Sequence, residues 1–183
     1  MSYALALGKA WTDLEKESQT KKYAVNFLGD EYSVDIEKRS ILSLSCNAPS
    51  KEFLSVLILH YLEKKLKGLP DLSKEWISFQ DIPESLGYYP VFKKRAIEPI
   101  LRKYGAKPVA MLEKWTLLNA KKVEYGDVGI IIEAFEKVPL LITFYLADQE
   151  FAPDANVLFD KSILKIFCTE DIAVLAEFVA RAL

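Results

Sequence analysis

Two apolar runs in the C-terminal half constrain the fold more than any other feature of the chain. They are Val128–Phe135 and Leu140–Leu146, and only Glu136-Lys-Val-Pro separates them. Both runs are rich in β-branched and aromatic residues and are almost uninterrupted, which is typical of central strands covered on both faces. The pattern therefore predicts a hairpin in the middle of a sheet.

The N-terminal region predicts a helix followed by a three-strand meander. Apolar residues recur at helical spacing over residues 4–17. Two alternating runs, at residues 23–28 and 31–36, flank Gly29-Asp30, where glycine supplies the positive φ that a tight turn requires. A third run at residues 41–45 completes an antiparallel meander.

Further helices are predicted between and after these strands. The expected segments are 51–67 with Ser50 as N-cap and Gly68 at its end, 91–104 with a kink or break at Pro99, 108–121, and a C-terminal helix capped by Thr169. We therefore predict an α+β fold that forms a single domain over residues 1–183. It would contain one mainly antiparallel sheet, made of the meander and the central hairpin, with helices packed on it.

Composition excludes several classes of protein. The 183 residues carry a formal net charge of −2, which gives no global attraction to nucleic acid or anionic lipid. No basic region precedes the short apolar stretch at the N-terminus, and the longest apolar run, residues 138–147, is about half of what a bilayer-spanning helix needs. We expect a soluble, cytoplasmic protein without nucleic-acid or membrane partners.

The two cysteines, Cys46 and Cys168, are too few for a thiolate-ligated zinc or iron–sulfur site within one chain. We interpret them as small buried apolar residues. A shared disulfide or an intermolecular metal site is the alternative.

The segment Ala147–Ile163 gathers the acidic candidates for a functional site. These are Asp148, Glu150, Asp154 and Asp160. Such oxygens suit a divalent metal such as Ca²⁺ or Mg²⁺, although the glycine of an EF-hand loop is missing. Alternatively the short acids accept backbone N–H groups in a strand-to-helix connection, which Phe151 and Phe159 would anchor in the core.

His60 is the only histidine, so any His-dependent triad depends on it, and a site built from several imidazoles is excluded. Its position at the border of the apolar face of helix 51–67 favours a partly exposed structural residue. The alternative is an axial ligand to a haem-like tetrapyrrole or corrinoid cofactor, which needs only one histidine.

Aromatic residues are frequent in the loop-rich middle of the chain. They are Trp76, Phe79, Tyr88, Tyr89 and Phe92. We predict that they line a pocket between the sheet and its helices. In Gly87–Arg95 the aromatics alternate with bases, which suits single-stranded nucleic acid or an anionic ligand, unless the aromatics face the core and the bases stay solvated.

Several segments together resemble the family described as domain of unknown function 3786, found in anaerobic bacteria and archaea. The matching pieces are Leu59–Leu62, Trp76–Pro83, Gly87–Phe92, Arg95–Pro99, Gly126–Val128, Val138–Leu140, Asp148–Asp160 and Thr169–Ile172. The resemblance implies no activity, but members are associated with iron–sulfur domains that bear clustered cysteines. This chain has Gln149 where members more often have a third acid.

The sequence contains none of the common nucleotide-binding, zinc-protease or serine-hydrolase motifs. The leading hypothesis is a non-catalytic binding or accessory protein for a small molecule or metallocofactor, with an iron–sulfur or corrinoid protein as partner. Two alternatives stay open. One is an enzyme that uses acids such as Glu150 and Asp160 for acid–base or metal-assisted chemistry, and the other is a protein–protein adaptor.

Overall fold

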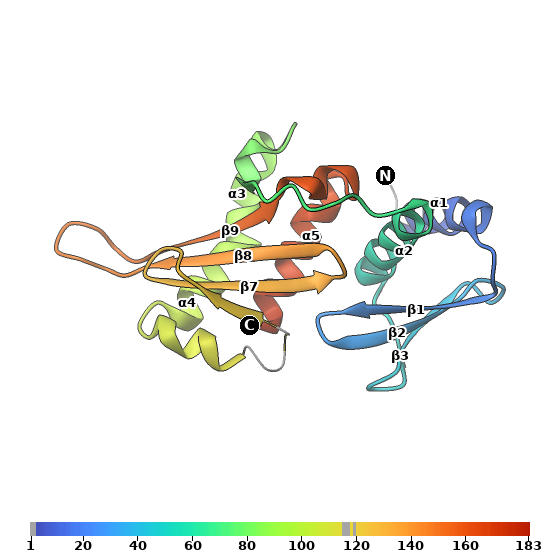
Figure 1. The fold of residues 1–183 in the computed structure, drawn as a ribbon, viewed down its shortest axis with the longest axis horizontal. Coiled ribbons are helices and arrows are strands. Elements are labelled where there is room, and N and C mark those ends of the chain that lie inside the picture. The colour runs from blue at the N-terminus through green and yellow to red at the C-terminus, as the bar shows by residue number, and fades with distance from the viewer. Residues whose placement is uncertain (1–2, 115–117, 119) are drawn as a thin grey trace.

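The computed structural model describes residues 3–114, 118 and 120–183, and it contains two antiparallel sheets (Figure 1). The first has four strands in the order β1-β2-β3-β4, and the second has five strands in the order β5-β9-β8-β7-β6. The strands are β1 Lys22–Phe27, β2 Asp30–Asp35, β3 Ser40–Ser43, β4 Ala48–Pro49, β5 Trp76–Ser78, β6 Ala120–Val123, β7 Val128–Phe135, β8 Val138–Tyr145 and β9 Asp154–Asp160.

Helices cover one side of each sheet (Figure 1). The α-helices are α1 Tyr3–Glu17, α2 Glu52–Lys67, α3 Tyr89–Phe92, α4 Glu98–Tyr104 and α5 Thr169–Ala182. A π-helical turn, η3 Lys93–Ile97, joins α3 to α4. Short 3₁₀ segments are η1 Phe79–Asp81, η2 Leu86–Tyr88, η4 Pro108–Lys114 and η5 Lys161–Lys165.

The α+β class is confirmed, but the prediction of a single sheet is wrong. The meander and the central hairpin belong to different sheets, and one backbone hydrogen bond, from Leu28 N to Ala134 O at 2.9 Å, links the β1–β2 turn to β7. The sheet positions beside the central hairpin are taken by β6 and β9, which pair with β7 and β8 respectively. The meander therefore has no free strand of the hairpin to pair with.

Both predicted hairpins are present. Strands β1 and β2 pair from Lys22↔Asp35 to Phe27↔Asp30, and the turn residues Leu28 and Gly29 have φ of 50° and 83°. A positive φ is easiest for glycine, which explains the glycine in this turn. In the second hairpin β7 pairs with β8 through almost its whole length, and all but two residues of β8 are buried.

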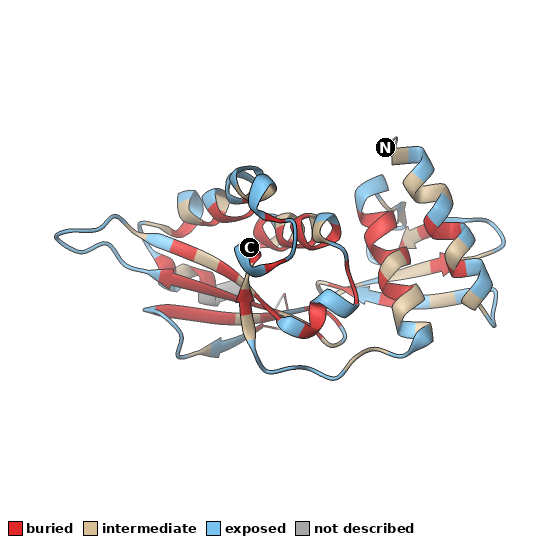
Figure 2. Ribbon diagram, turned by 90° about the horizontal axis from the view of Figure 1, so that it is seen from above, coloured by how far each residue is buried: buried red, intermediate tan, exposed pale blue. Residues whose placement is uncertain are grey.

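One hydrophobic core joins the two sheets. Tyr61 of α2 stacks on Phe135 of β7 with ring centroids 4.3 Å apart, and Phe27 of β1 lies 4.7 Å from the same ring. Phe178 of α5 meets Phe27 edge-to-face at 5.8 Å. Buried residues accordingly lie on the inner faces of the helices and strands in both halves (Figure 2).

The predicted caps and bounds of the helices were less accurate than the predicted strands. Lys51, not Ser50, is the N-cap of α2, and Cys168, not Thr169, precedes α5, with no side-chain cap at either helix. The predicted helix 91–104 is interrupted by the π turn, after which Pro99 occupies the first turn of α4, where its missing N–H costs nothing.

The predicted helix 108–121 is also wrong over the part that the structure describes. Residues 108–114 form a 3₁₀ segment and Ala120 begins strand β6, while 115–117 and 119 lie outside the described residues. Over residues 3–114, 118 and 120–183, no helix is both long and apolar enough to cross a membrane.

Candidate functional site

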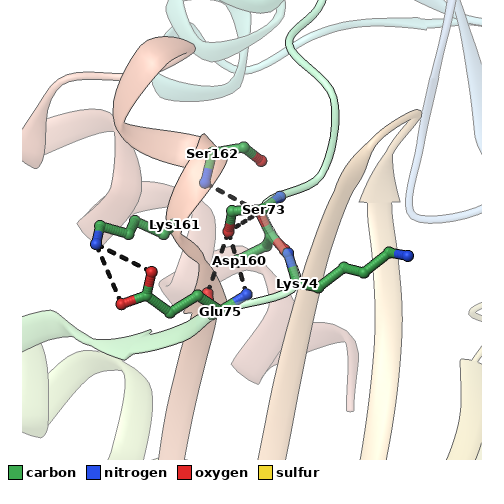
Figure 3. A network of polar contacts seen from close by, with 6 residues as sticks. All are labelled: Ser73, Lys74, Glu75, Asp160, Lys161 and Ser162. Atoms are coloured by element: carbon green, nitrogen blue, oxygen red, sulfur yellow. Dashed lines mark hydrogen bonds and ion pairs between the residues drawn. The ribbon is translucent and has the colours of Figure 1, made fainter.

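Asp160, one of the predicted site acids, is a structural residue at the end of β9 (Figure 3). It is 3% exposed, and its carboxylate accepts hydrogen bonds from Ser73 N and Oγ, Lys74 N and Ser162 N, all at 2.8–2.9 Å. Burial alone would raise its pKa, but these bonds outweigh that effect and lower the pKa to about 2. The carboxylate thus fixes the chain before β5, where Lys74 has a φ of 61°.

The other acids lie at the opposite end of the same strand. The β8–β9 loop projects from the end of the molecule that is far from α1 and α2 (Figure 1). There Asp148 Oδ1 accepts the N–H groups of Glu150 and Phe151 at 2.8 and 2.7 Å, and the first of these bonds is the main cause of its lowered pKa. Glu150 and Asp154 are exposed, so the four acids do not converge on one point.

Of the two predicted anchors of this segment, only one reaches the core. Phe159 is fully buried, whereas Phe151 is 68% exposed at the loop tip, so its predicted anchoring role is wrong. The loop lacks apolar neighbours at its tip because it extends beyond the helices that cover the sheet (Figure 1).

The five predicted pocket aromatics are not gathered around one hollow. Phe79 and Phe92 are buried and stacked face to face, with centroids 4.0 Å apart and planes 4° apart. Tyr88 and Tyr89 are half-buried and pack against the same core. Trp76 stands opposite Asp160 in the β5–β9 pair and lines a separate hollow of about 370 Å³. Most of these aromatics therefore serve packing.

A larger hollow lies elsewhere, where α1, α2 and the η5–α5 connection meet. Its volume is about 540 Å³. His60 and Glu63 of α2 form one wall, Ile166, Phe167 and Cys168 form another, and Lys9 of α1 closes a third side. We call this space the His60 hollow.

Within the His60 hollow, His60 is held by Asp171 of α5. The distance from His60 Nδ1 to Asp171 Oδ2 is 2.8 Å, and the two side chains are 34% and 11% exposed. Because a carboxylate oxygen can only accept, Nδ1 carries the proton. In the neutral ring the lone pair then lies on Nε2, the nitrogen that Asp171 does not hold.

Cys168 bonds to the same carboxylate oxygen. Its Sγ donates to Asp171 Oδ2 at 3.2 Å, so Asp171 connects the only histidine with one of the two cysteines. Both Cys46 and Cys168 are free and exposed, so the prediction that they are buried apolar residues is wrong. Cys46 also has a polar neighbour, since its Sγ donates to the hydroxyl of Ser43.

The pKa shifts of His60 and Cys168 follow from this arrangement. Burial alone would lower the pKa of His60, but the hydrogen bond and charge of Asp171 outweigh it and raise the pKa above the ordinary value of 6.5. Partial burial raises the pKa of the Cys168 thiol, and the charge of Asp171 raises it further. The thiol is therefore not activated as a nucleophile.

Charged groups around the hollow are unevenly paired. Asp13 and Glu63 form ion pairs with Lys16 and Lys67 at 2.7 and 2.5 Å. Three further lysines line the hollow and have no ion pair within the part of the chain that the structure describes. They are Lys9, Lys64 and Lys165. The unpaired charge at the hollow is positive.

The described residues contain no group of three or more His, Cys, Asp or Glu side chains that could hold a metal ion. His60 and Cys168 are directed at Asp171 rather than at a common point.

A thiol test follows from the geometry of Cys168. We expect iodoacetamide to alkylate Cys168 several times more slowly than free cysteine at pH 8, because less thiolate is present. Asp171→Asn should accelerate the reaction, whereas Asp154→Asn, on an exposed acid of β9, should not. Peptide mass spectrometry gives the rates, and an unchanged rate in Asp171→Asn would show that Asp171 does not control the thiol.

Sequence reasoning identified His60 but not its partner. That partner, Asp171, lies in the first turn of α5, where acids stabilise a helix N-terminus and need no other role. The available signal was the spacing Cys168-Thr-Glu-Asp171, which places the thiol beside the carboxylate three residues later. Nothing in the spacing shows that α2 delivers His60 to the same point.

Comparison with known proteins gives one match. The model of a family described as Domain of unknown function (DUF3786) matches residues 9–182. Curated proteins and solved structures give no match.

Proposed function

The chain belongs to the family described as Domain of unknown function (DUF3786), and we propose that it is a non-catalytic binding or accessory protein whose ligand occupies the His60 hollow. The ligand we propose is a metal-bearing cofactor with acidic substituents, of the haem-like tetrapyrrole class. The observation that carries the proposal is the 2.8 Å bond from His60 Nδ1 to Asp171, which leaves Nε2 available to a metal.

Support comes first from the donor set. A metal-ligating histidine almost always donates its other ring N–H to a carboxylate or carbonyl, which orients the ring and increases its basicity. His60 has this arrangement with Asp171. A metal bound within a tetrapyrrole needs only one protein ligand, which agrees with a chain that has a single histidine.

Support comes second from the lining. The side chain of Leu164, which is 37% exposed, offers apolar surface, and Lys9, Lys64 and Lys165 offer ammonium groups for carboxylates at the edge of a ring. When bound, such a cofactor would supply electron transfer or gas-ligand chemistry. This chain's own residues would orient the axial imidazole and bind the acidic substituents.

The competing functions have weaker support. The enzyme hypothesis relied on Glu150 and Asp160, but Asp160 is committed to four hydrogen bonds and Glu150 is exposed on a projecting loop. An adaptor that adds strands needs an open sheet edge, and one of the edge strands, β6, carries exposed Lys121 and Lys122, which discourage pairing. An iron–sulfur or corrinoid partner and a cytoplasmic location stay predictions.

A titration with haemin tests the proposal. We expect saturable binding with a shifted Soret band in the wild-type protein, and a loss of at least about 100-fold in affinity in His60→Ala, because the axial ligand is removed. Metal-free protoporphyrin IX should bind far more weakly than haemin to the wild-type protein, since it cannot use Nε2.

Lys107→Gln serves as the control, because Lys107 is exposed and lies outside the hollow. It should bind haemin like the wild type. Equal affinity of wild type and His60→Ala for haemin, or the absence of saturable binding to the wild type, would overturn the proposal.

A further inference from the structure

A second hollow, separate from the His60 hollow, lies between the start of α2, the π turn η3 and the outer side of α5. Its volume is about 400 Å³. Lys51 and Phe53 come from the start of α2, Arg95 from η3, and Phe178 and Arg181 from α5. Three segments that are far apart in the sequence thus bring three cations and two aromatic rings together.

The cations of this hollow are held in place but not neutralised. Glu177, whose side chain is 19% exposed, pairs with Arg95 Nη1 at 3.7 Å and with Arg181 Nη2. Lys51 forms no ion pair with any residue that the structure describes. Three positive groups therefore face one carboxylate, which leaves two positive charges unbalanced.

The arginines also keep donors free. Each guanidinium has five N–H donors in a planar fork that matches the oxygens of a phosphate or carboxylate. The Arg95 and Arg181 side chains are 54% and 64% exposed, so solvent reaches the donors that Glu177 does not use. The shared carboxylate orients both forks toward the same space.

Apolar side chains form part of the walls of the hollow. Phe53 is 56% exposed, and its ring packs against that of Tyr3 with centroids 4.4 Å apart and planes tilted by 55°. Phe178 and Val174 form the α5 side. A ligand held by the arginines would cover these surfaces if it carried a ring or another apolar body.

We propose that this hollow binds an organic anion, with a phosphate or carboxylate group on Arg95, Arg181 and Lys51 and an aromatic body against Phe53 and Phe178. The site deepens the sequence hypothesis for Gly87–Arg95. Phe92 is buried and Lys93 and Lys94 stay solvated, as the structural alternative expected, but Arg95 joins a binding surface that other segments complete.

Isothermal titration with four probes tests the site. We expect 1-naphthyl phosphate or 1-naphthoate to bind at least about tenfold more tightly than inorganic phosphate or 1-naphthol, because only the first two offer both charge and rings. Whichever of 1-naphthyl phosphate and 1-naphthoate binds more tightly identifies the anionic group that the site prefers. Binding should weaken with added salt, since the arginines are partly exposed.

Variants locate the binding. Arg95→Gln and Arg181→Gln should each lower the affinity for the stronger probe about tenfold, because each removes a guanidinium that binds the anion. Arg102→Gln, on an exposed arginine of α4, and His60→Ala should bind like the wild type. Thermal melting confirms that each variant is folded.

Equal affinity across wild type, Arg95→Gln and Arg181→Gln would overturn the proposal, as would 1-naphthol binding as tightly as the two anions. His60→Ala leaves the site at Arg95 and Arg181 intact. A failure of this proposal can therefore be distinguished from a failure of the proposal for the His60 hollow.

Discussion

Replacing Asp160 with alanine should lower the free energy of unfolding by about 2–3 kcal/mol, because it removes a buried carboxylate that accepts four hydrogen bonds and leaves the buried N–H of Ser162 without an acceptor. The carboxylate accepts the backbone N–H groups of Ser73, Lys74 and Ser162 and the Ser73 hydroxyl. Water has little access to the position of the carboxylate, since Asp160 is 3% exposed. Chemical denaturation followed by circular dichroism measures the loss.

Asp148→Ala is the matched control. Asp148 also accepts two backbone N–H groups, but it lies in an exposed loop where water can replace the carboxylate. Its substitution should leave the unfolding midpoint close to that of the wild type. A loss in Asp148→Ala as large as that in Asp160→Ala would contradict the assignment of Asp160 as the structural acid of this segment.

The hydrogen bonds to the Asp160 carboxylate make its contribution to stability depend on pH. Its pKa is lowered from 3.8 to about 2 in the folded protein, so its contribution is present above about pH 4 and is lost as the pH falls toward 2. The shift corresponds to about 2 kcal/mol. The stability difference between wild type and Asp160→Asn should therefore shrink over this range.

Asp171→Asn should weaken haemin binding about 10- to 100-fold without removing the ligating imidazole. Asparagine is close in size to aspartate, but it neither holds the Nδ1 proton as strongly nor attracts positive charge. The pKa of His60 should then fall from its raised value, because burial remains while the hydrogen bond and charge of Asp171 are lost. Asp171 acts here as a positioning residue.

The pH profiles separate positioning from general damage. In the wild type, protonation of Nε2 competes with the metal, so haemin affinity should rise as the pH passes upward through the raised pKa of His60, and in Asp171→Asn this rise should move to lower pH. The stability that the His60–Asp171 pair contributes has the opposite pH dependence. It is fully present below 6.5 and is lost as the pH rises through the folded-state pKa.

Asp154→Asn should change neither profile, because Asp154 is exposed on β9. If Asp171→Asn weakened binding equally at every pH and left the pKa of His60 in place, the positioning role would be wrong.

The fold was predictable where many residues carry the same signal. The runs of β7 and β8 predicted their hairpin because burial on both faces demands apolar residues throughout. The division into two sheets was not predictable, because strand pairing beyond a hairpin depends on contacts that are distant in sequence. Strand β6 begins within the predicted helix 108–121 for the same reason, since pairing with β7 overrides local preference.

The candidate site was likewise predictable only in part. Residue type and uniqueness pointed to His60, because few side chains can ligate a metal at neutral pH. The acids of Ala147–Ile163 gave a misleading signal, because aspartates that bond backbone N–H groups have the same composition as a cation site. The contact of Asp171 with His60 was not predictable, because it exists only where the fold brings α2 and α5 side by side.

The most direct measurement of the central claim is ¹⁵N NMR of the ring of His60, which is unambiguous because the chain has one histidine. Above the pKa of His60 we predict a proton on Nδ1 and a lone pair on Nε2, and a shift of the Nε2 resonance on addition of cobalt(III) protoporphyrin IX, a diamagnetic probe. A proton on Nε2, or ring resonances unmoved by saturating probe, would contradict the account.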